Sequence, residues 1–418
     1  MKRSFLKKIF SLTLCLAILL AINPLHNAFA QSNSDERKLQ FKNGEFKILV
    51  LSDIQDTNTP AKETSKLVNS AIDKTNPDFI VLLGDNIAGW WRNVTPEEVK
   101  SAIDTVAKAI DDRNIPFALV YGNHDHEGLC DEVNKMEEEQ AKELMMSWFQ
   151  KYNTCMSVEG EEMTGVGNYN ITIKNTEGTK DIFNLWFMDS NPYTPDEEGG
   201  GYGYVHEDQT AWYKRTSDAL KKANDGKPVP SIVFQHIIVP EAYEMFNEAS
   251  KFDKGAVRGH GVMSDKYYVP NPDYVYEGLL IEGPCSPDVN HGQFESWLEQ
   301  GDVVAGVFGH DHSNSFAGIY KDIRLVAVPG TTFYSYGNNH GVRTITLHEN
   351  DLWNFDSQIL TYEELTGTKI GNIFVSNHGY YEYYHRFLPL VIGGTALVAA
   401  LIGITVGIVN MKKKKNSK

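Results

Sequence analysis

Cysteine is scarce in this sequence, with four residues in a chain of 418. A dense disulfide framework of the kind that stabilises small secreted domains is therefore excluded. Cys15 lies in an apolar N-terminal segment, which leaves Cys130, Cys155 and Cys285 for the rest of the chain. A disulfide between Cys130 and Cys155 and a set of three free thiols are equally compatible with the sequence.

Basic residues are also fewer than acidic residues. The chain carries 39 Lys and Arg against 55 Asp and Glu, a formal net charge of −16. Nine of the basic residues lie in the two terminal segments, so the central part carries about −25. Non-specific nucleic-acid binding is not expected, because it depends on cationic side chains facing the phosphates. An acidic protein that binds phosphate needs a local positive charge, and a metal ion supplies one.

Long apolar runs occur at the two ends of the chain. Residues 2–22 combine a basic start with an apolar run, and Ala28-Phe29-Ala30 follows, which is typical of a secretory signal cut after Ala30. An uncleaved anchor is the alternative. Phe387 to Val409 is long enough to span a bilayer, and the lysines that follow indicate a cytoplasmic end. The sequence predicts a signal peptide (1–30), an extracellular domain (31–386), a transmembrane helix (387–409) and a cytoplasmic basic tail (410–418). The protein would then be a single-pass protein of the cell membrane.

The exported part shows no internal repeat, no low-complexity tract and no clear linker, so we expect one domain. Short apolar runs alternate with amphipathic segments, which is typical of βαβ units and a largely parallel sheet. Thr95 is expected to cap a helix, with Pro96 in its first turn and Glu98 completing a capping box. The expected strands are 46–51, 78–83, 116–121, 169–173, 182–188, 231–235, 303–308, 315–319, 323–328 and 342–348, and further helices are expected over 62–74, 137–151, 208–223 and 292–300.

Polar side chains follow five of these apolar runs. Any one of them has an ordinary explanation, such as a helix cap, a left-handed turn or a buried histidine with satisfied hydrogen bonds. Five of them together indicate one centre, because ligands of such sheets bind at the carboxyl ends of the strands. The five segments are Ser52-Asp53-Ile54-Gln55, Leu83-Gly84-Asp85-Asn86, Gly122-Asn123-His124-Asp125, Gln235-His236 and Gly309-His310-Asp311-His312.

The side chains in these segments offer carboxylate, amide and imidazole donors. This set suits Mn, Fe or Zn better than a metal that prefers thiolates. Seven ligands are too many for one catalytic ion that keeps an open position, but they fit two ions bridged by one carboxylate. The seven candidate ligands are Asp53, Gln55, Asp85, Asn123, His236, His310 and His312.

In their order along the chain, the five segments resemble the motifs of the calcineurin-like metallophosphoesterase family. Gly167-Asn168-Tyr169 and the segment 235–241 are similar to its purple-acid-phosphatase-like branch, the Dcr2 and purple acid phosphatase 29 type. The resemblance implies an α/β fold of four layers, an αββα sandwich in which two mixed β-sheets are flanked by helices.

The resemblance also implies a role for each candidate residue. Asp85 would bridge the two ions. His124 would contact the phosphate and protonate the leaving oxygen, and Asp125 is expected to orient His124. Asn123 and His260 are expected to contact the substrate as well. The first ion would be held by Asp53, Gln55, Asp85 and His312, and the second by Asp85, Asn123, His236 and His310.

One position departs from the family pattern. The family usually has histidine where this chain has Gln55. An amide oxygen is a weaker donor than imidazole, so we expect a looser or more manganese-like first position. The tyrosine that colours purple acid phosphatases is also replaced, since Ile54 or Gln55 stands in its place, and no purple colour is predicted.

These observations together predict a phosphoesterase that depends on two metal ions (Mn, Fe or Zn). It would hydrolyse phosphate esters, phosphomonoesters in preference, by attack of a metal-bound hydroxide. Its expected partners are a phosphorylated small molecule or phosphoprotein and the membrane that anchors its C-terminal helix. A phosphodiesterase or nucleotide pyrophosphatase on the same site is one alternative. A non-catalytic surface binding protein with a vestigial metal site is another; Gln55 supports it, and the intact His124 speaks against it.

Overall fold

The computed structural model describes residues 37–370, apart from 90–92, 196–199 and 338. The predicted signal peptide, transmembrane helix and basic tail lie outside these residues. Within the described ranges, none of the helices combines the length and the apolar character that crossing a membrane requires. Cys130, Cys155 and Cys285 are free thiols in the described part of the chain.

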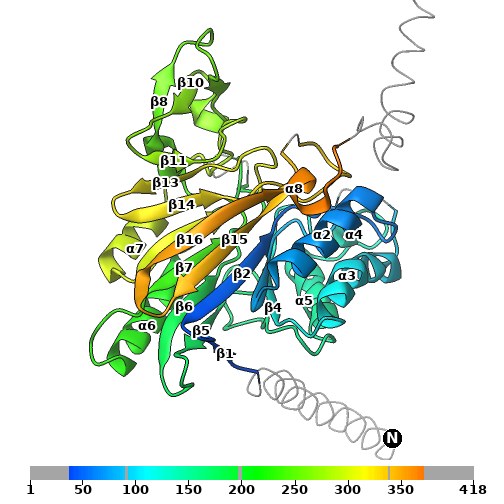
Figure 1. The fold of residues 1–418 in the computed structure, drawn as a ribbon. Coiled ribbons are helices and arrows are strands. Elements are labelled where there is room, and N and C mark those ends of the chain that lie inside the picture. Colours follow the sequence, from blue (N-terminus) through cyan, green and yellow to red (C-terminus); the bar gives the residue numbers. More distant parts are fainter. Residues whose placement is uncertain (1–36, 90–92, 196–199, 338, 371–418) are drawn as a thin grey trace, which may run out of the picture.

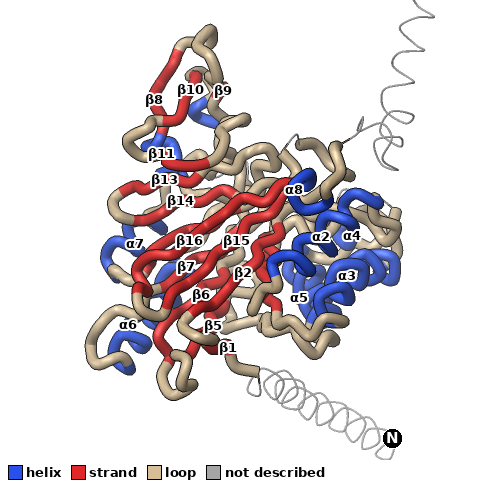
Figure 2. Tube along the Cα trace, viewed as in Figure 1, coloured by secondary structure: helices blue, strands red, loops and turns tan. Residues whose placement is uncertain are grey.

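The first of two central sheets has five strands in the order β16-β15-β2-β3-β4, and Figure 2 shows β16, β15 and β2 side by side. Its parallel part consists of β2 (Glu45–Leu51), β3 (Phe79–Leu83) and β4 (Phe117–Val120). The last two strands of the described residues, β15 (Gly341–His348) and β16 (Asp351–Thr361), extend it in antiparallel pairing. The sheet is therefore mixed, with a parallel half that carries three of the predicted segments.

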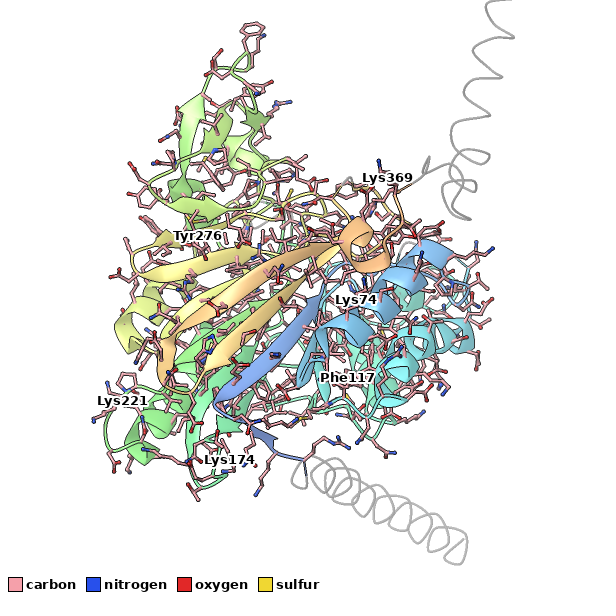
Figure 3. All side chains as sticks on the ribbon, in the orientation of Figure 1. Lys74, Phe117, Lys174, Lys221, Tyr276 and Lys369 are labelled. Atoms are coloured by element: carbon pink, nitrogen blue, oxygen red, sulfur yellow. The ribbon has the colours of Figure 1, made fainter. Side chains whose placement is uncertain are left out.

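The second sheet has eight strands and is also mixed. Its centre is parallel, and antiparallel strands lie toward both edges. Lys174 near one edge and Tyr276 near the other are labelled in Figure 3. The order is β1 (Leu39–Gln40), β5 (Tyr169–Lys174), β6 (Asp181–Phe187), β7 (Ser231–Gln235), β12 (Val303–Phe308), β14 (Ile323–Ala327), β13 (Ala317–Tyr320) and β11 (Val275–Glu277).

The two sheets pack face to face and share one hydrophobic core. Ile48 and Val81 of the first sheet lie in the same buried cluster as Phe234 and Val307 of the second. The central strands are buried on both faces, which explains their nearly continuous apolar sequences. Each fully buried side chain of this kind contributes about 1.5–3 kcal/mol.

Helices cover the outer face of each sheet, which gives the four-layer αββα sandwich that the sequence predicted (Figure 1). The capping box predicted at Thr95 is present. The side chain of Thr95 accepts from the backbone N–H of Glu98, and the side chain of Glu98 accepts from the backbone N–H of Thr95. Over the five-stranded sheet lie α2 (Lys62–Thr75), α3 (Pro96–Asp111), α4 (Glu127–Cys130), α5 (Glu138–Phe149) and α8 (Tyr362–Thr366), and over the eight-stranded sheet lie α6 (Glu207–Ala223) and α7 (Gln293–Gln300).

A small third sheet projects from the body of the protein (Figure 1). It has the order β8-β10-β9 and lies between 235 and 292, where the sequence analysis predicted neither a helix nor a strand. Its strands β8 (Phe246–Ala249), β10 (Tyr267–Pro270) and β9 (Val257–Arg258) are two to four residues long and largely solvent-facing. Strands this short show no alternation that a sequence pattern can reveal.

Candidate metal centre

The fold brings the five polar segments together at the carboxyl ends of strands. Asp53 and Gln55 follow β2, Asp85 follows β3 and Asn123 follows β4, while the histidines come from the second sheet. His236 follows β7, and both His310 and His312 follow β12. All seven predicted ligands are buried, with no side chain more than 7% exposed. The centre thus lies where the two sheets meet.

The backbone at these strand ends adopts an unusual conformation. Asp53, Gln55, Asp85 and His310 have positive φ angles of 49°, 38°, 48° and 72°. Non-glycine residues in this region cost about 1–3 kcal/mol each and are concentrated at functional sites. Gly84 tolerates no side chain, because a Cβ atom there would lie 2.5 Å from Nδ1 of His236. The strained backbone thus directs the polar side chains of these residues toward one point.

Three of the seven residues already satisfy the geometry of a metal site. The ligand atoms of Asp53, Asp85 and His236 all lie within 4.8 Å of one another. Oδ2 of Asp85 is 3.5 Å from Nε2 of His236, and Oδ1 of Asp53 is 3.3 Å from Nε2 of His312. Carboxylates from one sheet therefore face imidazoles from the other.

Unpartnered polar atoms provide the test of whether these residues fit a metal. Such atoms are rare in protein interiors because each costs about 1–3 kcal/mol. A cation at the centre would relieve this cost for every one of them, so the residues present fit the expected ions. The buried atoms without a hydrogen-bond partner among the described residues include Oδ1 of Asp53, Oε1 of Gln55, Oδ1 of Asn123, Nε2 of His236 and Nε2 of His310.

Contacts outside the centre orient several of the ligands. Nδ1 of His236 lies 2.9 Å from the carbonyl oxygen of Leu83, and Nδ1 of His312 lies 2.8 Å from that of Tyr336. Each imidazole therefore donates from Nδ1 and turns Nε2 inward, the usual arrangement of metal-binding histidines. Gln55 donates its amide N–H to Asp85, which leaves its oxygen available as a ligand.

The charges in the centre favour a cation. Burial would raise the pKa of Asp53, but the charges of His312 and His236 outweigh it and keep the pKa below its ordinary value. Burial would lower the pKa of His236, but Asp85 and Asp53 raise it to about 10. Burial and the charge of His236 lower the pKa of His310 to about 3, so this imidazole is neutral, the form that binds metals.

His124 lies beside the predicted ligands. Its backbone N–H donates to Oδ1 of Asp85 at 2.9 Å, and its ring atom Nδ1 lies 2.9 Å from Oε1 of Glu127. Burial would lower its pKa, but the bond to Glu127 and the charges of Asp85 and Glu127 prevail and raise it. A protonated imidazole beside a candidate metal centre can give a proton to a leaving group.

The role predicted for Asp125, orienting His124, stays a prediction. Asp125 accepts from the backbone N–H groups of Gly122 and Asn86, each at 2.7 Å, and so joins the loops after β3 and β4. Glu127 makes the contact with His124. Sequence reasoning missed Glu127, although a carboxylate three residues after a histidine is within reach when the backbone turns helically, as it does at α4.

Three tyrosines surround the candidate ligands, and two of them, Tyr193 and Tyr202, were not singled out from the sequence. The hydroxyl oxygen of Tyr193 accepts a 2.9 Å bond from Nδ2 of Asn123. The rings of Tyr202 and His310 lie 4.3 Å apart, and Tyr336 stacks on His312 at 4.1 Å. The sequence predicts neither a helix nor a strand over 192–203, and the spacing of the residues there carries no signal for these contacts.

His260 lies at the rim of the site, outside the group of predicted ligands. Its exposed ring is 5.2 Å from the ring of Tyr202, which in turn lies 4.3 Å from the ring of His310. Its backbone N–H donates to the hydroxyl of Tyr243 at 2.8 Å. Its role as a substrate contact stays a prediction.

Comparison with known proteins agrees with this geometry. The profile of the calcineurin-like phosphoesterase family matches residues 46–314, and the chain belongs to this family. It is accordingly a metallophosphoesterase, a hydrolase of phosphoric ester bonds.

Relatives place the chain near the purple acid phosphatases. It is 29% identical over 366 residues to "Probable inactive purple acid phosphatase 29" of Arabidopsis thaliana, covering 79% of this chain and 81% of that protein. It is 27% identical over 277 residues to "Phosphatase DCR2" of Saccharomyces cerevisiae, covering 66% of this chain and 42% of the yeast protein. A solved structure of a dimetal phosphatase from Danio rerio superposes with a TM-score of 0.40 at 13% identity, over 76% of this chain and 99% of that one.

Proposed function

We propose that the protein is a two-metal phosphomonoesterase that faces the outside of the cell. The observation that carries the proposal is the convergence of five unpartnered buried ligand atoms beside a histidine with a raised pKa. One ion would be held by Asp53, Gln55, Asp85 and His312, and the other by Asp85, Asn123, His236 and His310.

When bound, the two ions would supply the positive charge that binds a phosphoryl group and lowers the pKa of an attacking water. The protein's own part is to hold the ester in line with His124. As the bond from phosphorus to the leaving oxygen breaks, the protonated His124 gives its proton to that oxygen. Glu127 holds Nδ1 of His124, so that Nε2 carries the proton toward the ester.

An acid beside the proposed centre supports the hydrolysis of esters of simple alcohols. A simple alcohol is a poor leaving group, and its departure needs a proton donor. The raised pKa of His124 favours the protonated form, which is the form that can donate. The substrates we propose are phosphorylated small molecules or phosphoproteins outside the cell, reached by a domain on a single C-terminal anchor.

Two observations favour a second candidate function. The plant relatives carry the word "inactive" in their names, and Gln55 replaces the histidine expected at the first metal position. A surface protein that binds metal or phosphate without turnover would fit both facts. The bond between His124 and Glu127 argues against it, because a site without catalysis needs no oriented acid.

The deciding experiment uses the full chain purified in detergent. Its metal content is measured by mass spectrometry, and its rates on p-nitrophenyl phosphate and bis-p-nitrophenyl phosphate are compared with Mn, Fe and Zn each added back. Two metals with faster monoester hydrolysis support the proposal, and faster diester hydrolysis would replace it with a phosphodiesterase. Two metals without turnover of phosphorylated small molecules or phosphopeptides would favour the binding protein.

The proposed location has its own test. Intact cells that produce the chain with an epitope tag at the C-terminus are treated with protease. Digestion of the catalytic domain with survival of the tag is the expected result. Protection of the domain in intact cells would contradict an outward-facing domain.

A further inference from the structure

The side chain of Asn123 has two polar ends in different surroundings. Its Oδ1 is buried and has no hydrogen-bond partner among the described residues. Its Nδ2 donates a 2.9 Å bond to the hydroxyl oxygen of Tyr193. Only the oxygen end of a neutral amide has lone pairs for a metal ion, since its nitrogen is a donor. The contact with Tyr193 therefore decides which end of the amide faces the centre.

Tyr193 is held in place independently of Asn123. Its backbone pairs with that of Tyr202 in an antiparallel bridge. The N–H of Thr194 donates to the carbonyl of Gly201 at 3.0 Å, and the hydroxyl of Thr194 donates to the carbonyl of Tyr202 at 2.9 Å. At the base of the loop, the amide of Asn191 donates to the carbonyl of Tyr204 at 2.8 Å. The backbone of Tyr193 is thus held by its own loop, independently of Asn123, and the hydroxyl it presents can act as a support.

Tyr193 and Tyr202 also connect the loop with a second proposed ligand, His310. Their rings stack with centroids 6.0 Å apart, and the ring of Tyr202 meets His310 nearly edge-on at 4.3 Å. Asn123 and His310 are two of the four residues expected to hold the second ion. The tyrosine pair therefore acts on one metal position, by a hydrogen bond to Asn123 and by packing against His310.

We propose that Tyr193 is a positioning residue for the second metal ion. Its hydroxyl oxygen accepts from the amide nitrogen of Asn123 and so keeps the amide oxygen turned toward the ion. The inference rests on the proposed two-metal function. Tyr193→Phe removes only the oxygen and keeps the ring that stacks on Tyr202, so the amide loses its directing acceptor while the loop keeps its packing. Loss of such an outer partner weakens metal binding about 10–100-fold.

The test measures metal binding and does not depend on turnover. The full chain in detergent is stripped of metal, and Mn²⁺ is titrated by calorimetry. Wild type is expected to bind two ions; Tyr193→Phe should bind one of them about tenfold or more weakly and the other unchanged. The electron paramagnetic resonance signal of the coupled Mn²⁺ pair should be reduced at equal added metal. Tyr204→Phe is the matched control in the same loop, where the ring stacks on His206 and His291, and both affinities should stay at the wild-type values.

Each outcome separates this inference from the function on which it rests. Unchanged affinity of Tyr193→Phe for both ions would overturn the positioning role even if the wild-type enzyme hydrolyses esters. Equal weakening in Tyr204→Phe, or a large drop in the melting temperature of the metal-free Tyr193→Phe variant, would assign the effect to loop packing and also overturn it. A wild type that binds two ions but hydrolyses no ester would overturn the proposed function alone. A wild type that binds no Mn²⁺ would overturn both.

Discussion

Nδ1 of His124 lies 2.9 Å from Oε1 of Glu127, and the two side chains are equally accessible, each 30% exposed. The pair is local, because its members are only three positions apart along the chain. It leaves Nε2 of His124 as the ring atom that can face a substrate. Glu127 raises the pKa of His124 through its hydrogen bond and its charge, so this carboxylate is expected to set the pH range in which the acid works.

Glu127→Gln should shift the activity profile. The acid must be protonated to work, so activity falls as the pH rises above its pKa. Removing the charge of Glu127 lowers the pKa of His124, and the alkaline side of the kcat profile should move to lower pH. With an alkyl phosphate, kcat near neutral pH should fall about tenfold. The measurement is kcat against pH for an alkyl phosphate and for p-nitrophenyl phosphate.

The leaving group gives the internal control for this variant. p-Nitrophenolate leaves without much protonation, so its rate should fall less than that of the alkyl ester. Glu132→Gln, an exposed acid nearby on the surface, should leave both profiles at wild type. An unchanged profile for Glu127→Gln with the alkyl ester would contradict the role of the pair.

His124→Ala and Asp85→Asn should fail in different ways. His124→Ala removes the acid and no ligand, so metal content should be kept while kcat for an alkyl phosphate falls about 10²–10⁴-fold. Asp85→Asn removes the charge of the residue expected to bridge both ions, so metal should be lost along with activity. Metal analysis and kcat on the same preparations distinguish the two. Full activity of His124→Ala on an alkyl phosphate would exclude it as the acid.

The buried part of the fold could be predicted from the sequence. The strands predicted at 46–51 and 78–83 agree with β2 and β3 within one residue, because strands buried on both faces are almost continuously apolar. The edge strand β16 was missed. Most of its residues are at least partly exposed, so a hydrophobic core does not constrain which side chains it carries. Its pairing with β15 is set by the chain reversal that precedes it.

Of the candidate site, the sequence indicated only the residues proposed as ligands. Asp53 and His312 are recognisable because each comes within a few residues of the end of an apolar strand and belongs to an ordered set of side chains that can bind a metal. Glu127 and Tyr193 carry no such signal. Their contacts depend on a one-turn helix and on a hydrogen-bonded loop, whose geometry is decided by tertiary structure after the strands have assembled.

Gln55→His should restore the usual ligand of the family at the first metal position. Imidazole is a stronger donor to Zn and Fe than an amide oxygen is, so the preference for Mn²⁺ over Zn²⁺ should decrease. Histidine is among the residues that tolerate the positive φ of 38° found there. Competition titrations of Mn²⁺ against Zn²⁺ measure the change. If the variant gains turnover where wild type has none, the binding-protein interpretation of the native chain gains support.

Lys142→Met should be strongly destabilising. Nζ of Lys142 is buried and lies 2.7 Å from both Oδ2 of Asp189 and Oε1 of Glu138, and Asp189 is itself buried. The variant would leave the charge of Asp189 without its partner, which costs about 3–5 kcal/mol. Denaturant unfolding measures the loss, and Lys142→Met combined with Asp189→Asn should recover part of it. In the partly exposed pair of Lys100 and Asp104, Lys100→Met should cost no more than about 0.5 kcal/mol.

His340 should make the fold sensitive to acid. Its ring is buried and stacks on Phe333 at 3.9 Å. Burial lowers its pKa to about 4, whereas an unfolded chain has a value of about 6.5. Below pH 6.5 the unfolded state therefore binds more protons at this position, and the stability of the fold decreases as the pH falls toward 4. The full decrease amounts to about 3 kcal/mol.

The measurement compares the free energy of unfolding of wild type and His340→Gln between pH 7.5 and pH 4. The variant cannot take up the proton, so its stability should decline less steeply, and the two proteins should differ by about 3 kcal/mol more at pH 7.5 than at pH 4. Other titrating groups are shared by both proteins and cancel in this difference. Parallel curves over the whole range would mean that His340 binds protons equally in the folded and unfolded states, and that its burial does not govern its ionisation.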